Sequence, residues 1–221
     1  GQVQVLARQQ LELLRGGTIT AGTLGSGSPG TIDVQAGTLR LDGRGAADSF
    51  TGIAGDALFT GTGAAVTVQA TRLEVLEGSS ISTSTQSARA GQPLRVVADS
   101  LLVDGGGNAR TATGISADTG GAGDAGSLSI TAREFSVVGE GLVSTSTLGS
   151  GRGGAMTIEA TTVHLARSGG LASVAGGAGN AGRIDVRASA SVDITEGGFI
   201  VASSGGAGAA GRIRFDTARF S

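Results

Sequence analysis

An alanine recurs at regular intervals along nearly the whole chain, each time closing a short alternation of apolar and other residues. The repeated step reads apolar-x-apolar-x-Ala at Ile32-Val34-Ala36, Val66-Val68-Ala70, Leu94-Val96-Ala98, Leu128-Ile130-Ala132, Met156-Ile158-Ala160 and Ile184-Val186-Ala188. Successive alanines are separated by 34, 28, 34, 28 and 28 residues. Because an apolar residue at every second position turns one side of a strand inward, this repeat predicts stacked strands in an all-β solenoid.

Each repeat contains two further short apolar segments, so we expect three short strands per repeat. The second segment follows the alanine by three or four residues, at Leu39-Leu41, Leu73-Val75, Leu101-Val103, Phe135-Val137, Val163-Leu165 and Val192-Ile194. The third is centred on a single apolar residue, often in a Ser/Thr run, at Ile19, Ile53, Ile81, Ile115, Val143, Leu171 and Ile200. Parallel crossover connections are overwhelmingly right-handed. The chain is therefore expected to form one right-handed parallel β-helix over residues 1–221, with about seven coils of 28 or 34 residues.

Composition supports this fold and narrows the functions. The chain has 42 glycines, 39% hydrophobic residues and only 15% charged residues, as expected for short strands joined by tight turns. Sixteen basic and eighteen acidic residues nearly cancel, so we expect no nucleic-acid partner. The absence of cysteine excludes disulfides and cysteine-ligated metal sites. A β-propeller or a leucine-rich repeat would show longer repeats or an Asn-containing Leu framework, and neither pattern occurs.

Two repeats are longer than the others at the same corner. Residues 43–52 and 105–114 carry the insertions, six extra residues each, between the second and third predicted strands. Loops inserted at one corner of a solenoid lie on one side of it, where partners can bind. A plainer interpretation is a decorated corner without a partner, since the loops are rich in small residues. The candidate contact residues are Arg44, Asp48, Phe50, Asn108, Arg110 and Thr111.

In the second half of the chain, four copies of a G-x-G-x-x-G pattern resemble nucleotide-binding loops when taken singly. They lie at residues 121–126, 149–154, 177–182 and 206–211. A dinucleotide loop requires a helix to follow, whereas a two-period strand follows each of these copies. The repetition instead predicts a structural corner, in which glycine provides positive φ and close backbone approach.

The residues expected to face outward do not form a catalytic group. The single histidine, His164, lies between inward-facing Val163 and Leu165, so alternation turns it to the surface. The outward positions of the first predicted strands are Asp33, Thr67, Arg95, Ser129, Thr157, Asp185 and Arg214. This series has no adjacent acidic pair for acid/base work, so we expect neither an enzyme nor a bound cofactor or metal.

The repeats resemble those of filamentous-haemagglutinin-like proteins. The resemblance is carried by Asn-Ala-Gly-Arg-Ile-Asp-Val-Arg-Ala at 180–188, by Val-Asp-Ile-Thr-Glu-Gly-Gly-Phe-Ile at 192–200, and by the unit from Gly154 to Ser173. It covers almost all of the chain and specifies architecture more than activity. The N-terminal secretion domain of that family typically carries Asn-Pro-Asn, and this chain has no Asn-Pro, so it resembles the downstream repeat region.

This resemblance implies export through an outer-membrane β-barrel transporter of the two-partner type and display at the bacterial cell surface. The leading hypothesis is thus a structural and adhesive stalk segment, a piece of a longer rod, that contacts a receptor or glycan on a host or neighbouring cell. Two alternatives remain open. One is a carbohydrate-active β-helix enzyme, and the other is an extracellular filament unit that self-associates end to end.

Overall fold

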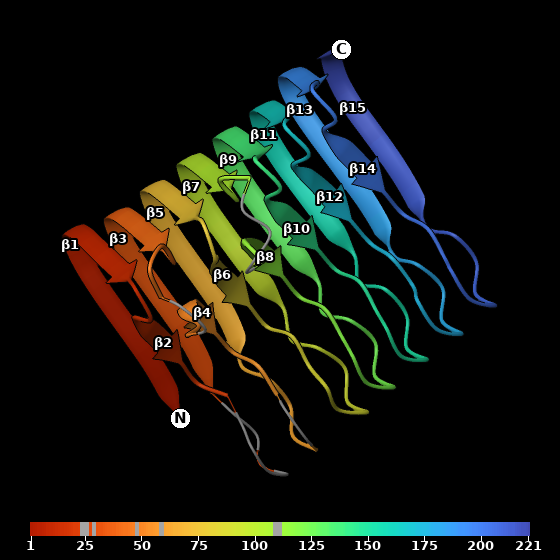
Figure 1. The fold of residues 1–221 in the computed structure, drawn as a ribbon, viewed down its shortest axis with the longest axis horizontal. Coiled ribbons are helices and arrows are strands. Elements are labelled where there is room, and N and C mark those ends of the chain that lie inside the picture. The colour runs from red at the N-terminus through yellow and green to blue at the C-terminus, as the bar shows by residue number, and fades with distance from the viewer. Residues whose placement is uncertain (23–26, 28–29, 47–48, 58–59, 108–111) are drawn as a thin grey trace.

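The computed structural model describes residues 1–22, 27, 30–46, 49–57, 60–107 and 112–221. Within these residues the chain is all-β, and its named strands form two parallel sheets (Figure 1). This arrangement is consistent with a parallel β-helix or solenoid, as the repeat predicts. Over the same residues, no helix is long and apolar enough to span a membrane.

Long and short strands alternate along the chain, and each kind forms its own sheet. The eight-stranded sheet has the order β1 (Gln2–Leu14), β3 (Thr31–Asp42), β5 (Ala65–Leu76), β7 (Leu94–Asp104), β9 (Leu128–Val138), β11 (Met156–Leu165), β13 (Arg183–Ile194) and β15 (Arg212–Phe220). The seven-stranded sheet contains β2 (Thr18–Thr20), β4 (Thr51–Ala54), β6 (Ser79–Ser82), β8 (Gly114–Ser116), β10 (Leu142–Ser144), β12 (Gly170–Ala172) and β14 (Phe199–Val201). Each strand therefore pairs with its equivalent one repeat away.

The expectation of three separate short strands per repeat is wrong in one respect. The first and second predicted strands form one continuous long strand that bends just after the repeated alanine, as in β3. Pairing continues across the bend, because Ala36 pairs with Ala70 and Thr38 pairs with Arg72. The third predicted strands are the short strands. A further parallel ladder consists of single bridges that join Ala57, Thr85, Thr119, Thr147, Ala175 and Ser204.

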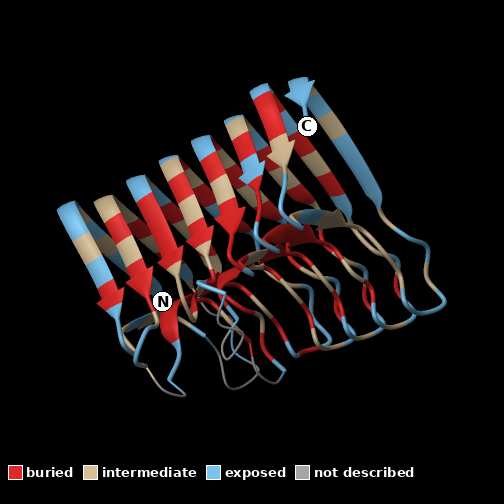
Figure 2. Ribbon diagram, turned by 45° about the horizontal axis from the view of Figure 1, so that its top comes forward, coloured by how far each residue is buried: buried red, intermediate tan, exposed pale blue. Residues whose placement is uncertain are grey.

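The apolar positions of the repeat form the core, in the predicted register. Ile32 pairs with Val66 and Leu39 with Leu73, and the repeated alanines align from Ala36 to Ala188. Buried residues of the two sheets, such as Val66 and Ile81, belong to one hydrophobic cluster. Figure 2 shows burial along the inner strands, whereas β1 and β15 are mostly exposed or intermediate. Stacking thus buries what a single repeat cannot bury alone.

The four G-x-G-x-x-G segments join β8, β10, β12 and β14 to the long strands that follow them, and we call this the glycine corner. Its glycines stack on the backbone of the preceding repeat, so a Cβ on Gly149 would lie 1.8 Å from the carbonyl oxygen of Gly121. A Cβ on Gly179 would lie 1.7 Å from the oxygen of Gly151. The prediction of a structural corner is confirmed. The prediction of positive φ is wrong here, since none of the glycines in these four segments has positive φ, whereas Glu140 and Gly197, in turns between long and short strands, do.

Candidate functional site

The two insertions begin at equivalent places, after the carboxyl ends of β3 and β7. Asp42 pairs with Leu76, and Leu76 pairs with Asp104, so the insertions lie on the same edge of the long sheet, with one short turn between them. We call this edge the insertion corner, meaning residues 42–52, 76–79 and 104–114. Both insertions therefore begin on one edge of the long sheet, and the placement of the loops themselves stays a prediction.

Each insertion closes with a buried threonine that caps the turn of the preceding repeat. The backbone N–H of Gly16 donates to Oγ1 of Thr51 at 2.7 Å, and that of Gly78 donates to Oγ1 of Thr113 at 2.6 Å. Both threonines are almost fully buried. The bases of the two loops are therefore held by the same kind of hydrogen bond.

A network of ion pairs covers the insertion corner at the end of β3. Arg40 lies 2.8 Å from a carboxylate oxygen of Asp42 and 3.1 Å from one of Glu74 on the next strand. Arg44 donates to both carboxylate oxygens of Asp42 and lies 3.6 Å from Glu77. Hydrogen bonds from Arg44, together with that from Arg40, hold the pKa of Asp42 well below its usual range. The carboxylate of Asp42 is thus ionised and neutralised by two guanidinium groups.

Of the six predicted contact residues, the structure describes two. Arg44 keeps 55% of its side chain exposed although it pairs with Asp42 and Glu77, and Phe50 is 39% exposed. Asp48, Asn108, Arg110 and Thr111 lie outside the described residues. Glu77 contacts Arg44, and a Cβ on Gly106 would lie 2.5 Å from its Cγ, so this side chain lies between the bases of both loops. A role of these loops in partner contact stays a prediction.

Asp42 and Glu74 share Arg40, a proximity that the sequence analysis missed. The alternation along the first predicted strands does not reveal this proximity. Asp42 and Glu74 lie on the second halves of β3 and β5, and they come together only through the register of the two strands. A pair that works as acid and base needs one protonated carboxyl group. The low pKa of Asp42 and its two arginine partners fit a structural role instead.

Two half-buried aspartates, Asp56 and Asp118, occupy equivalent positions after β4 and β8. Oδ1 of Asp56 accepts hydrogen bonds from the hydroxyl of Ser82 at 2.7 Å and from the backbone N–H of Ser84 at 2.8 Å. Asp118 accepts the corresponding bonds from Ser144 and Ser146. Burial raises the pKa of both carboxyl groups, and the hydrogen bonds oppose this shift. Each aspartate ties its repeat to the next.

We expect Asp56→Asn to raise the free energy of unfolding near neutral pH and to change it little at about pH 3, below the ordinary Asp pKa. When the pKa of a carboxyl group is higher in the folded protein than in the unfolded chain, protonation of that group stabilises the fold. This contribution is fully present below the pKa of the unfolded chain and is lost as the pH rises through the pKa of the folded protein. The neutral amide avoids that loss, and its oxygen can keep both hydrogen bonds of Oδ1.

Urea denaturation at the two pH values measures this effect. The exposed Asp99→Asn is the control for loss of one surface charge. An equal effect of Asp56→Asn at both pH values would contradict the assignment of a raised pKa.

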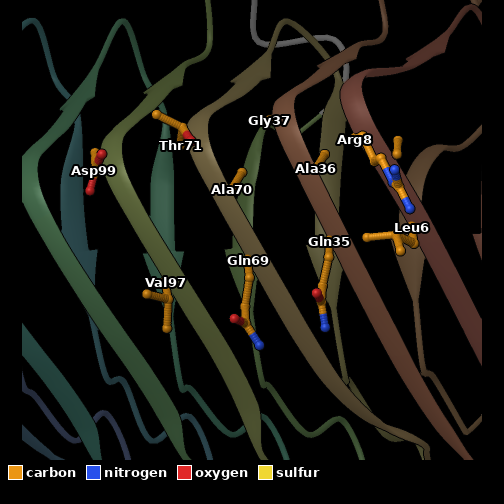
Figure 3. Close-up of a pocket in the computed structure, with 11 residues that line it drawn as sticks. Leu6, Arg8, Gln35, Ala36, Gly37, Gln69, Ala70, Thr71, Val97 and Asp99 are labelled. Carbon is orange, nitrogen blue, oxygen red and sulfur yellow. The ribbon is translucent and has the colours of Figure 1, made fainter.

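Two separate hollows lie on the surface of the long strands beside the repeated alanines, and we call the one at the β1 end the bend groove. It has a volume of about 430 Å³. Its floor includes Ala36, Ala70 and Gly37, with Gln35 and Gln69 on one side and Thr71 and Asp99 on the other (Figure 3). A second hollow of about 350 Å³ lies at the other end, lined by Glu159, Ala160, Arg187, Ala188, Ser189, Asp216, Thr217 and Ala218.

The sequence analysis did not single out the bend groove. Its signal was present in the residues that immediately precede and follow each repeated alanine. Separate first and second strands offered no reason to expect a concave surface there. The continuous bent strand provides one.

The other predicted surface positions lie where alternation puts them. His164 is exposed between buried Val163 and Leu165. The series that starts with Asp33, Thr67 and Arg95 pairs in register, strand by strand, as far as Arg214. Among the residues that the structure describes, no three His, Cys, Asp or Glu side chains lie close enough together to hold a metal ion.

The topology defines the class of the chain as an all-β protein with two parallel sheets of stacked strands. Comparison of the chain with protein-family models, with curated proteins and with solved structures finds no match.

Proposed function

We propose that this chain is a stalk segment of an exported bacterial surface protein of the filamentous-haemagglutinin-like type. In this proposal residues 1–221 form a right-handed parallel β-helix of about seven coils that presents binding surfaces along a stiff rod. The hand follows from the rule for parallel crossovers. The coil number follows from the seven short strands, each of which ends one unit of long and short strand.

The observation that carries the proposal is the unbroken pairing along the stack. Every long strand pairs in parallel with the next from β1 to β15, and every short strand does so from β2 to β14. A solenoid whose repeats contact only their neighbours extends in one direction and offers long side surfaces. The buried columns of Ile, Val and Leu favour a stiff rod rather than a catalytic protein.

The resemblance of the repeats supplies the setting of the proposal. It implies export through an outer-membrane transporter and contact with a receptor or glycan on a host or neighbouring cell. We assign no catalytic step to the chain, because the neighbouring carboxylates of Asp42 and Glu74 are paired with arginines.

Shortening both insertions is expected to reduce adhesion while leaving the fold intact. Deletion of 44–49 with Phe50→Gly, and of 106–111 with Ala112→Gly, would restore the short turn found at Glu77-Gly78. Thr51 and Thr113, which cap the preceding turns, are retained. We expect at least a tenfold loss of binding when the protein is displayed on bacteria and applied to host cells and to neighbouring bacteria, as for loss of one strong contact.

Circular dichroism of the purified variant controls for folding. Unchanged adhesion would overturn the role of the loops. Cryo-electron microscopy of the exported parent protein tests the stalk itself: a surface rod with strands about 4.8 Å apart supports it, and a compact particle overturns it. Filaments joined end to end would favour the self-assembly alternative.

A further inference from the structure

We propose that the bend groove binds an extended, neutral, β-1,4-linked polysaccharide whose chain runs along the stack of strands. The inference deepens the proposed adhesive function, on which it rests, by naming the ligand class and by assigning it to a surface other than the insertion corner.

The bend groove crosses four neighbouring long strands, β1, β3, β5 and β7. One column consists of the residues that precede the repeated alanines, namely Leu6, Gln35, Gln69, Val97, Thr131, Glu159, Arg187 and Asp216, paired in register. The hollow at the β1 end and the hollow at the β15 end both lie on this column. A ligand that fills the bend groove must therefore lie across these four strands.

The polar side chains at the β1 end are free to bind. In the part of the chain that the structure describes, Arg8, Gln35, Gln69 and Asp99 have no side-chain hydrogen bond or ion pair. Each glutamine amide offers both donors and an acceptor. Such groups match the vicinal hydroxyls of a sugar, which also donate and accept. The small floor residues let the ring of a sugar approach the backbone.

The spacing of the strands suits a sugar polymer. Neighbouring strands lie about 4.7–4.9 Å apart, so Gln35 and Gln69 present the same amide at that interval. The rise of an extended β-1,4-linked chain per sugar is similar. Gln35 and Gln69 can thus make the same kind of contact with two successive sugars, and such weak contacts add.

The charges favour a neutral ligand over an anionic one. Arg8 and Asp99 line the hollow at the β1 end, and Arg187 lies 3.0 Å from Glu159 in the other, near Asp216. Groups of both signs alternate, so the groove has no field that would attract a polyanion. An extended peptide would need an open strand edge, whereas the groove lies on the face of paired strands.

Titration calorimetry of the purified chain with cellohexaose, mannohexaose and chitohexaose tests the proposal. We expect at least one hexamer to bind, and to bind more tightly than its dimer. Gln35→Ala with Gln69→Ala should weaken that binding about tenfold, from lost hydrogen bonds to both amides. Gln2→Ala with Gln4→Ala is the matched control, since these two exposed glutamines of β1 lie outside the groove lining.

Three results would overturn the groove proposal: no binding of any hexamer, tighter binding of hexagalacturonate, or an equal loss in the control variant. These results are separable from failure of the stalk function. Glycan binding by a protein that is not displayed at a cell surface would overturn only the stalk, whereas display without glycan binding would overturn only the groove.

Discussion

Gly177→Ala is expected to lower the free energy of unfolding by about 3 kcal/mol, at the upper end of the usual cost of overpacking. A Cβ at Gly177 would lie 2.0 Å from the carbonyl oxygen of Gly149 in the preceding repeat. The clashing atom belongs to the backbone, so no side-chain rotation can relieve the contact. The two repeats would have to separate locally, which would weaken their hydrogen bonds. Urea denaturation followed by circular dichroism measures the change.

The adjacent glycine provides the control for this substitution. A Cβ at Gly176 has its nearest neighbour, a side-chain carbon of Leu148, at 3.5 Å, an ordinary contact distance. Neither glycine has positive φ, so both substitutions are matched in backbone conformation. We expect Gly176→Ala to change stability by less than about 0.5 kcal/mol, as for most surface substitutions. Equal losses in the two variants would refute close stacking at the glycine corner.

Phe135→Ala is expected to cost about 3–5 kcal/mol, the usual range for truncating a buried aromatic residue. Among the residues that the structure describes, Phe135 is the largest fully buried side chain, and it lies in the middle of the stack, on β9. Its register partners are Leu101 and Val163, which would line the resulting cavity. Since each repeat is held by its neighbours, the loss should be concentrated around β9.

Hydrogen exchange of backbone amides locates this loss along the chain. We expect faster exchange in β7, β9 and β11 than in β3 and β5, together with a lower midpoint of denaturation. Phe135→Leu is the control, because leucine occupies the same column at Leu101 and should cost less than about 1.5 kcal/mol. A uniform increase in exchange along the chain would show that the stack unfolds as a single cooperative unit instead.

Much of the fold could be predicted from the sequence because one spacing governs the repeat. Aligning the alanines from Ala36 to Ala188 aligns the inward residues, and the structure pairs them in that register. The glycine corner was likewise accessible, since four equally placed motifs precede strands and not helices. The alternation of apolar residues specifies the strand register directly.

The features that escaped prediction depend on the path of the backbone or on contacts between repeats. Side-chain alternation breaks at Gly37 in the same way whether the strand ends or bends. The sequence pattern therefore predicts two strands where the structure has the single strand β3. The pairing of Arg40 with Glu74 becomes visible only once register joins two strands. The hydrogen bonds that Asp56 accepts come from Ser82 and Ser84, which lie one repeat away. Sequence patterning within one repeat does not contain these relations.

The difference between the two corners sets where such a chain can change its length. At the insertion corner, two of the repeats accept six additional residues while the strands on either side keep their register. At the glycine corner, even a methyl group at Gly177 meets the backbone of the preceding repeat. The stack can therefore change its length at the insertion corner, whereas close packing at Gly177 leaves no room there even for one added side-chain carbon.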